Sequence, residues 1–153
     1  NDKRGFLREV FQRHIIKKNL VFSVTSSSKK NVLRGLHLQT KKSQDKYVTV
    51  LKGKILDVVV DLRKKSKTYG KHFKIILDEN NSKFLFIPKG FAHGFLGLGR
   101  ENIVLYSCTN YRHAKSEKAV LWNDKDLKIK WGIKKPIISK KDRSAQKFKD
   151  IKF

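Results

Sequence analysis

From residue 32 onward, short apolar runs follow one another with short turns between them, and this pattern restricts the possible folds more than any other feature. Runs such as residues 55–62 and 102–108 are rich in Val, Ile and Leu, and Gly, Pro or Asn marks the turns that separate them. No long segment with a helical period intervenes. A series of short strands predicts an all-β sandwich, barrel or jelly roll.

The strand pattern also predicts local pairing. Residues 47–51 and 55–62 flank Lys52-Gly53-Lys54, a short glycine-containing turn that favours a β-hairpin. At the N-terminus, residues 8–19 fit either a helix or an irregular arm. Beyond Asn123 the chain becomes polar, so we expect a covering segment followed by a basic tail. Trp122 and Trp131 are expected to anchor this segment, and Pro136 to interrupt regular secondary structure in it. Residues 1–153 are expected to form a single domain.

The formal net charge of +24 leaves two interpretations open. One is binding to nucleic acid or another polyanion. The other, which we favour, is a solvated lysine surface, because the lysines occur in scattered doublets with no compact Arg-rich block. Such a surface attracts anionic small molecules without requiring nucleic acid as a partner.

The cysteine content of the chain bears on its cellular compartment. Cys108 is the only cysteine, so no intrachain disulfide can form and a reducing, cytoplasmic compartment is expected. The apolar runs are too short to span a bilayer, and we expect no membrane partner. The chain opens at Asn1 without Met, which suggests that a segment precedes it.

The stretch Arg34-Gly35-Leu36-His37-Leu38-Gln39 places a cation and an imidazole in a strand-like run. Imidazole is the side chain whose ordinary pKa lies near neutrality, so His37 beside Arg34 suits proton transfer on an anionic substrate. The alternative is a half-exposed strand histidine beside a surface arginine. These six residues alone do not separate the two interpretations.

Period-two geometry places Asp57 in apolar surroundings, on one strand face with Ile55, Val59 and Asp61. An ionised carboxylate is costly there unless it is paired. Lys46, across the expected hairpin, is the nearest candidate cation. The Lys46–Asp57 pair is then either a structural ion pair or a pair positioned to interact with negative charge on a substrate.

His93 forms the second histidine site, on one face with Phe91 and Phe95 if the segment is extended. A histidine between aromatic residues is commonly a satisfied core residue. A metal site is the alternative, but the chain has no closely spaced His pair, Cys cluster or His-x-His with a nearby carboxylate. We therefore expect no metal.

Several of these segments, in order, resemble the successive signatures of the dTDP-4-dehydrorhamnose 3,5-epimerase family. The resemblance extends from Asp2 to about Asp142, and the order and spacing of the motifs make it specific. It implies a cupin-type jelly roll, a homodimer that exchanges N-terminal strands, and catalysis without a metal or other cofactor. The segments are RGLHLQ (34–39), QDK (44–46), GKILDVVVDLR (53–63), SKTYG (66–70), IPKGFAHGF (87–95), WND (122–124) and SKKD (139–142).

The resemblance also implies catalytic roles. His37 corresponds to the general base that removes a proton next to the 4-ketone of the sugar, and Asp142 to the carboxylate paired with it. Lys46 would stabilise the enolate oxygen, with Asp57 orienting it. Tyr106 would return a proton to the opposite face.

Binding roles follow from the same resemblance. Arg34 would hold the nucleotide diphosphate, His93 would line the sugar pocket, and Gln39 belongs to the substrate-binding strand. In the N-terminal motif, Arg4 and Glu9 occupy positions that contact the diphosphate and the base.

Four positions depart from the family pattern. Leu7 replaces an aromatic residue, Phe22 and Val24 stand where Gln and Asn are usual before a Ser-rich turn, and Asn31 replaces a glycine. Asn tolerates the left-handed conformation that a glycine there would adopt. The first three bear on nucleotide contacts and leave the proton-transfer residues intact.

The sequence therefore predicts an epimerase that inverts C3 and C5 of a nucleotide-linked 4-keto-6-deoxy sugar through an enolate. The substrate expected from the family is dTDP-4-dehydro-6-deoxy-D-glucose and the product dTDP-4-dehydro-L-rhamnose. Two alternatives remain open: a 3-epimerase or 3,4-ketoisomerase on a related nucleotide sugar, and a polyanion-binding jelly roll without catalysis.

Overall fold

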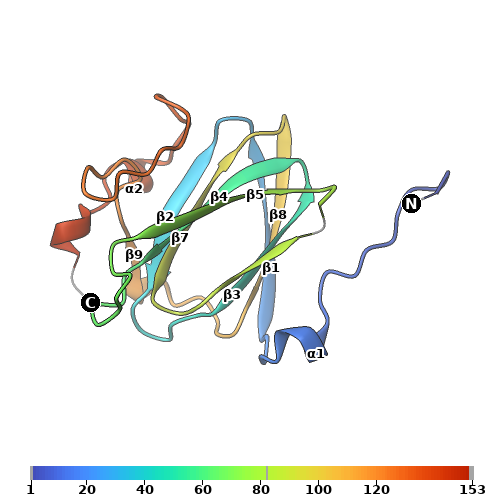
Figure 1. Ribbon diagram of the computed structural model, residues 1–153, viewed down its shortest axis with the longest axis horizontal. Coiled ribbons are helices and arrows are strands. Elements are labelled where there is room, and N and C mark those ends of the chain that lie inside the picture. The colour runs from blue at the N-terminus through green and yellow to red at the C-terminus, as the bar shows by residue number, and fades with distance from the viewer. Residues whose placement is uncertain (1, 82, 152–153) are drawn as a thin grey trace.

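The computed structural model describes residues 2–81 and 83–151, and these fold into two antiparallel sheets packed face to face (Figure 1). The first sheet has the order β1-β8-β3-β6 and the second the order β5-β4-β7-β2-β9. The strands of the first are β1 (Phe22–Lys29), β8 (Glu101–Cys108), β3 (Lys46–Lys52) and β6 (Phe84–Ile87). The strands of the second are β5 (His72–Asp78), β4 (Lys54–Asp61), β7 (Phe91–Gly97), β2 (Leu33–Gln39) and β9 (Glu117–Ala119). The all-β prediction is confirmed.

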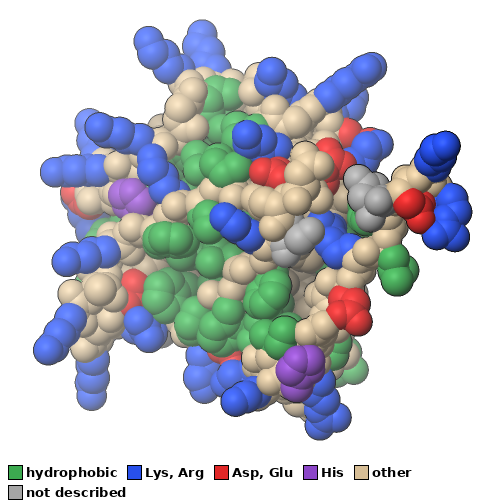
Figure 2. Space-filling view, turned by 45° about the vertical axis from the view of Figure 1, so that its right-hand side comes forward, with side chains coloured by type: hydrophobic (Ala, Val, Ile, Leu, Met, Phe, Trp, Pro, Cys, Tyr) green, Lys and Arg blue, Asp and Glu red, His purple; other side chains and the backbone are tan. Residues whose placement is uncertain are grey.

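Helices in the described residues are short. They are α1 (Arg13–Ile16), α2 (Lys140–Arg143) and two 3-10 turns, η1 (Ala114–Ser116) and η2 (Phe148–Asp150). The N-terminal segment is therefore an irregular arm with a single helical turn. Its first residues extend away from the sheets (Figure 1), while Arg8 Nη2 donates to the Val50 carbonyl on β3 at 2.8 Å. Lys and Arg side chains are spread over the face drawn in Figure 2 rather than gathered in one block.

The predicted hairpin around Gly53 is wrong, because β3 and β4 lie in opposite sheets. β3 pairs with β6 and β8, whereas β4 pairs with β5 and β7. Gly53 has φ +82°, and a Cβ there would lie 2.0 Å from the carbonyl oxygen of Glu101. A short loop with a glycine indicates a tight turn, but it does not show whether the two strands pair as a hairpin or lie in different sheets.

The Ser-rich segment expected to be a turn is strand β1, which is a second correction. β1 is an edge strand and pairs with β8 along its whole length, from Phe22 opposite Cys108 to Lys29 opposite Glu101. Pairing with a neighbour overrides the weak strand propensity of serine. The expectation at Asn31 is confirmed, since this residue has φ +67°.

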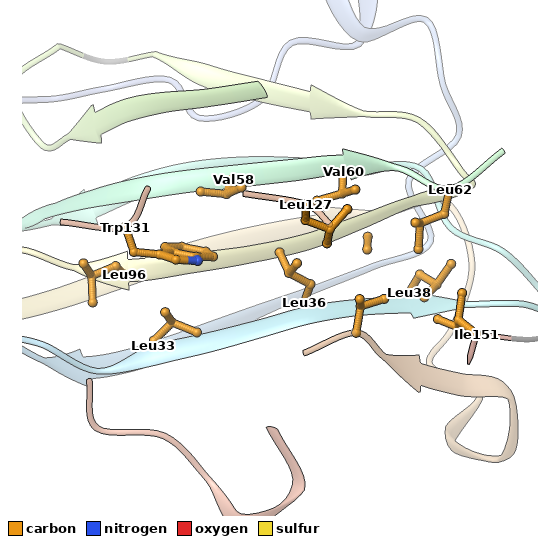
Figure 3. Close-up of a cluster of buried hydrophobic side chains, with 12 residues drawn as sticks. Leu33, Leu36, Leu38, Val58, Val60, Leu62, Leu96, Leu127, Trp131 and Ile151 are labelled. Atoms are coloured by element: carbon orange, nitrogen blue, oxygen red, sulfur yellow. The ribbon is translucent and has the colours of Figure 1, made fainter. Parts of the chain in front are cut away.

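Two apolar layers stabilise the fold. One lies between the sheets and includes Val48, Val50, Ile55, Val59, Leu77, Ile87, Phe95 and Val104. The other lies on the outer face of the five-stranded sheet, where Leu127, Trp131 and Ile151 cover β2, β4 and β7 (Figure 3). β4 is thus buried on both faces, which explains its continuous apolar run. The predicted C-terminal covering segment is confirmed.

The buried Asp61 at the end of β4 allows a test of how a paired carboxylate contributes to the stability of the fold. Its carboxylate is buried and accepts hydrogen bonds from Arg63, from Ser66 Oγ and from Thr68 Oγ1. The Arg63 guanidinium, with the two hydroxyls, holds the pKa of Asp61 well below its ordinary value.

A carboxyl with a depressed pKa in the folded state stabilises the fold above its unfolded pKa of about 3.9 and loses this contribution as the pH falls below that. We expect Asp61→Asn to lower the free energy of unfolding at pH 7 by roughly 1–3 kcal/mol and to flatten its decline between about pH 5 and 2. Urea unfolding across that range measures both effects. Asp2→Asn, at an exposed pair with Arg4, is the control, and equal curves for the two variants would contradict the expectation.

Candidate active site

A cavity of about 510 Å³ opens between the two sheets and is lined by all four predicted catalytic residues. Its lining includes His37, Lys46, His93, Tyr106 and Asp142. A larger cavity of about 960 Å³ is lined by strand ends and loops that carry both charges, and it contains none of these groups. The candidate site is therefore the smaller cavity.

The two sheets contribute different groups to this cavity. His37 on β2 and His93 on β7 are direct partners across two paired strands of the five-stranded sheet. Lys46 on β3 and Tyr106 on β8 belong to the four-stranded sheet, where Lys46 lies opposite Cys108 and Tyr106 opposite Val48. A molecule in the cavity thus meets the imidazoles from one side and the ammonium and phenol from the other.

His37 is paired with Asp142, as predicted. Its Nε2 lies 2.6 Å from Asp142 Oδ1, and the His37 side chain is 29% exposed while that of Asp142 is 5% exposed. Burial is the largest single effect and favours the neutral carboxyl, but the hydrogen bond and charge of His37, together with hydrogen bonds from Gly35 and Ser139, outweigh it and hold the pKa of Asp142 below its ordinary value. The ionised carboxylate therefore accepts from Nε2–H, which leaves Nδ1 of His37 as the basic nitrogen.

Asp142 itself is fixed by local structure. Ser139 is the N-cap of α2, and its Oγ accepts a hydrogen bond from the Asp142 backbone N–H. The second carboxylate oxygen accepts from the backbone N–H of Gly35 at 3.4 Å. The SKKD motif thus turns the chain so that its last residue reaches β2.

The close packing of β2 against β7 explains why β2 has a glycine at position 35. Gly35 has φ +120°, and a Cβ there would lie 2.5 Å from Gly94 Cα and 2.7 Å from the His93 carbonyl oxygen. The register between β2 and β7 shifts between Arg34 and His37. The close approach of the two strands at these glycines places the two histidines side by side.

Asp57 pairs with His93, and the predicted Lys46–Asp57 pair is wrong. Both carboxylate oxygens of Asp57 lie 2.9–3.0 Å from His93 Nε2, and both side chains are buried. Lys46 and Asp57 belong to opposite sheets rather than to one hairpin, so the neighbouring strand β7 supplies the partner. His93 also contacts Tyr106 edge-on, with ring centroids 5.8 Å apart.

Burial shifts the pKa of both groups on the four-stranded sheet. It lowers the pKa of Lys46, and the nearby Cys108, Glu117 and Asp57 oppose this shift only in part. It raises the pKa of Tyr106 well above the ordinary value, so the phenol stays protonated at neutral pH. The cavity therefore combines a paired imidazole, an ammonium of reduced pKa and a protonated phenol.

Arg34 lies at the wall of the same cavity. Its Nε donates to Ser28 Oγ at 2.9 Å and its Nη2 to the Ser27 carbonyl at 3.1 Å, so β1 fixes the guanidinium. Gln39 lines an adjoining recess together with Phe22 and Val24. Its amide donates to the Lys42 carbonyl at 2.9 Å and accepts from the His113 backbone N–H at 2.9 Å. Gln39 therefore fixes loops around the site.

The structure does not bring Arg4 or Glu9 to the cavity of their own chain. Arg4 is exposed and pairs with Asp2 at 2.6 Å, and Glu9 hydrogen-bonds to Gln12 within the arm. Leu7, on the same arm, is almost fully exposed.

Sequence reasoning missed Glu117, which lines the cavity. It accepts from Lys141 Nζ at 2.6 Å and from Arg112 Nη2 at 3.0 Å. These two cations outweigh the effect of burial and lower the pKa of Glu117. Lys141 lies inside the SKKD motif, but no motif marked Glu117, whose short strand β9 joins β2 at the sheet edge.

Among residues 2–81 and 83–151, no group of three or more His, Cys, Asp or Glu side chains is arranged to hold a metal ion. In the same part of the chain, no helix has the length and apolarity needed to cross a membrane.

Fold and cavity together define a small jelly-roll enzyme that is built for acid–base chemistry. The sequence model of dTDP-4-dehydrorhamnose 3,5-epimerase matches residues 1–150. The chain belongs to the dTDP-4-dehydrorhamnose 3,5-epimerase family, and the prediction of a cupin-type jelly roll is confirmed.

Relatives and solved structures agree with this assignment. The enzyme of that name from Methanothermobacter thermautotrophicus is 44% identical over 94% of this chain and 82% of its own length. The 3,5-epimerase RmlC from Legionella pneumophila, solved with dTDP-4-keto-L-rhamnose, is 38% identical with a TM-score of 0.94, covering 99% of this chain and 85% of that one. ChmJ, a 3'-monoepimerase from Streptomyces bikiniensis, is 26% identical with a TM-score of 0.89, covering 97% and 79%.

Proposed function

We propose that this chain inverts C3 and C5 of dTDP-4-dehydro-6-deoxy-D-glucose to give dTDP-4-dehydro-L-rhamnose. The observation that carries the proposal is the two-sided cavity, with the His37–Asp142 pair on one sheet and Tyr106 and Lys46 on the other. Inversion requires a base and an acid on opposite faces of one carbon. The complex of the Legionella relative with dTDP-4-keto-L-rhamnose supports the choice of substrate.

The first step is removal of a proton next to the 4-ketone. His37 Nδ1 takes this proton, and the Asp142 carboxylate stabilises the imidazolium that forms. The electron pair moves onto the ketone oxygen, where Lys46 donates a hydrogen bond. Negative charge on that oxygen restores the preference of Lys46 for its charged form, so the interaction is strongest when the enolate is present.

The second step returns a proton to the same carbon from the other face. The O–H bond of Tyr106 breaks, a C–H bond forms, and the enolate becomes a ketone again. Its raised pKa keeps the phenol protonated until this step. Arg34, at the cavity wall, is positioned to bind the diphosphate, and the His93–Asp57 pair provides a fixed polar edge for the sugar.

Deuterium exchange tests this function directly. The purified protein is incubated in heavy water with dTDP-4-dehydro-6-deoxy-D-glucose, and NMR follows deuterium at C3 and C5 and the configuration of the product. We expect label at both carbons and an L-rhamno product. Absence of exchange at both carbons would refute the proposal, and strong salt-sensitive nucleic-acid binding without turnover would indicate a polyanion-binding protein instead.

A single-centre epimerase is the second candidate, because the fold is shared with the 3'-monoepimerase ChmJ. The same NMR experiment separates the two, since a 3-epimerase labels C3 and leaves the configuration at C5 unchanged. A 3,4-ketoisomerase would move the carbonyl group from C4 to C3, which the carbon spectrum reports.

We further propose a homodimer in which the arms are exchanged. Hydrophobic side chains gather within a surface rich in Lys and Arg (Figure 2), and the exposed ones include Phe84 and Phe86 on the sheet and Val10 and Phe11 on the arm. Tyr47 donates to the Ile16 carbonyl at 3.1 Å, so the arm is attached beside this apolar face. A second copy offers a matching apolar surface, and an exchanged arm would carry Arg4 and Glu9 to the partner's cavity.

Complementation tests the exchange. Arg4→Ala and His37→Asn chains are each expected to be weak epimerases alone. When they are co-expressed, half of the dimers combine one chain of each kind, and each of these has one site with an intact His37 and an intact partner arm. We expect recovery of about a quarter of wild-type activity. Recovery no greater than the sum of the two separate variants would contradict exchange, and light scattering reports whether a dimer forms at all.

We also propose that the protein works in the cytoplasm, where a free thiol such as that of Cys108 stays reduced. Neither nucleic acid nor a membrane is proposed as a partner, because the cationic surface is scattered and the anionic ligand that the cavity suits is a nucleotide sugar.

A further inference from the structure

The hydroxyl of Ser26, a partly buried residue on β1, stands out from the other buried polar atoms. Within residues 2–81 and 83–151, its Oγ is the one buried side-chain nitrogen or oxygen that has no hydrogen-bond partner. Such a group is costly, and in most folded proteins it is satisfied. Ser26 lines neither the catalytic cavity nor the recess beside it.

Tyr106, which lines both the cavity and the recess, is a neighbour of Ser26. In the β1–β8 register, Val24 lies opposite Tyr106 and Ser26 opposite Val104, so Ser26 and Tyr106 are diagonal neighbours on one face. The Ser26 hydroxyl acts on the phenol in the direction that lowers the pKa of Tyr106, against the larger effect of burial, which raises it. The contact falls outside the geometry of a full hydrogen bond, so the Ser26 hydroxyl is only weakly engaged with the phenol.

Proton transfer changes what the phenol needs. When Tyr106 gives its proton to the sugar carbon, the electron pair of the broken O–H bond remains on the phenol oxygen as a phenolate. A phenolate in a desolvated position requires a donor, and hydrogen bonds to an ionised oxygen are stronger than those between neutral groups. A donor that is weakly engaged before the transfer and strongly engaged after it lowers the barrier rather than tightening substrate binding.

Arg34 contributes to the same environment. It acts on Tyr106 as a nearby positive charge, and β1 fixes its guanidinium through Ser28 Oγ and the Ser27 carbonyl. Strand β1 thus fixes the positive charge of Arg34 next to the phenol and also carries the Ser26 hydroxyl beside it. Arg34 lines the cavity and is placed to bind the diphosphate, whereas Ser26 reaches the reaction only through Tyr106.

We propose that Ser26 is a positioning residue for Tyr106, with its hydroxyl rotating to donate a hydrogen bond to the phenol oxygen as the proton leaves. This inference rests on the proposed epimerase function. It assigns to the Ser-rich strand β1 a part in the reprotonation step, in addition to its role in the sheet.

Ser26→Ala separates this role from a structural one. An unpartnered buried hydroxyl contributes nothing favourable to folding, so its loss should leave the melting temperature unchanged or raise it. We expect inversion to slow by about tenfold or more, while deuterium exchange through His37 continues, so that the ratio of exchange to inversion rises by a similar factor. Ser26→Thr keeps the hydroxyl and should restore inversion to within about threefold of wild type. Thr25→Ala, on the exposed face of the same strand, is the matched control.

Each result has a definite meaning. Unchanged inversion in Ser26→Ala, with an active wild type, overturns the positioning role and leaves the proposed function in place. Equal losses of exchange and inversion also overturn it, because the defect would then not be specific to reprotonation. If Ser26→Ala fails to fold, wild-type inversion in Ser26→Val, which also lacks the hydroxyl but fills more space, overturns it. A wild type without exchange refutes the proposed function and this inference together.

Discussion

Replacement of His37 by asparagine is expected to reduce epimerisation by about 10²–10⁴-fold, the range typical for loss of a general base. Asparagine matches the inner part of imidazole in shape, but its amide ends near the position of Nδ1 and does not reach Asp142, whose carboxylate keeps the hydrogen bond from the Gly35 backbone N–H. Asparagine cannot accept a proton near neutral pH. Deuterium exchange at C3 and C5 should therefore fall together with inversion, because removal of the proton precedes both.

The matched control for this prediction is His72→Asn on β5, an edge strand of the same sheet that contributes nothing to the cavity lining. It should exchange and invert like wild type. Asp142→Asn makes a second comparison, since it keeps the imidazole but removes the charge that stabilises imidazolium. Exchange at wild-type rate in His37→Asn would exclude His37 as the base and leave His93 as the imidazole to examine.

The strands of this protein could be predicted from the sequence, but their pairing could not. Alternation along residues 55–61 correctly places Asp57 on the inner face, because a period of two is a local property of an extended chain. Which strand lies next to it depends on sheet topology. Gly53 marks a turn correctly, yet nothing local distinguishes a hairpin from a crossing between sheets.

The same limit explains the errors at the site. The expected hairpin around Gly53 would place Lys46 next to Asp57, whereas His93 reaches Asp57 from the adjacent strand. The His37–Asp142 contact joins residues 105 positions apart, and only the family resemblance predicted it. Glu117 and Ser26 escaped notice because a short edge strand and a serine run carry no local signal of chemistry.

Replacement of Tyr106 by phenylalanine is expected to separate exchange from inversion. The ring and its edge contact with His93 remain, so the cavity keeps its shape, but the proton on the opposite sheet is lost. His37 can still remove a proton and return deuterium to the same face. We therefore expect exchange with retention of configuration at a rate near that of wild type, while inversion falls by about 10²–10⁴-fold.

Proton and carbon NMR on a single reaction in heavy water measure both quantities for Tyr106→Phe. Tyr69→Phe is the control, because Tyr69 stacks on Phe148 outside the cavity and should have no effect on either rate. Loss of exchange in Tyr106→Phe would mean that the phenol also takes part in forming the enolate, and inversion at wild-type rate would remove it as the acid. The predicted separation of rates is specific to an acid that faces the base across the two sheets, because a residue that only shaped the cavity would impair proton removal and proton return alike.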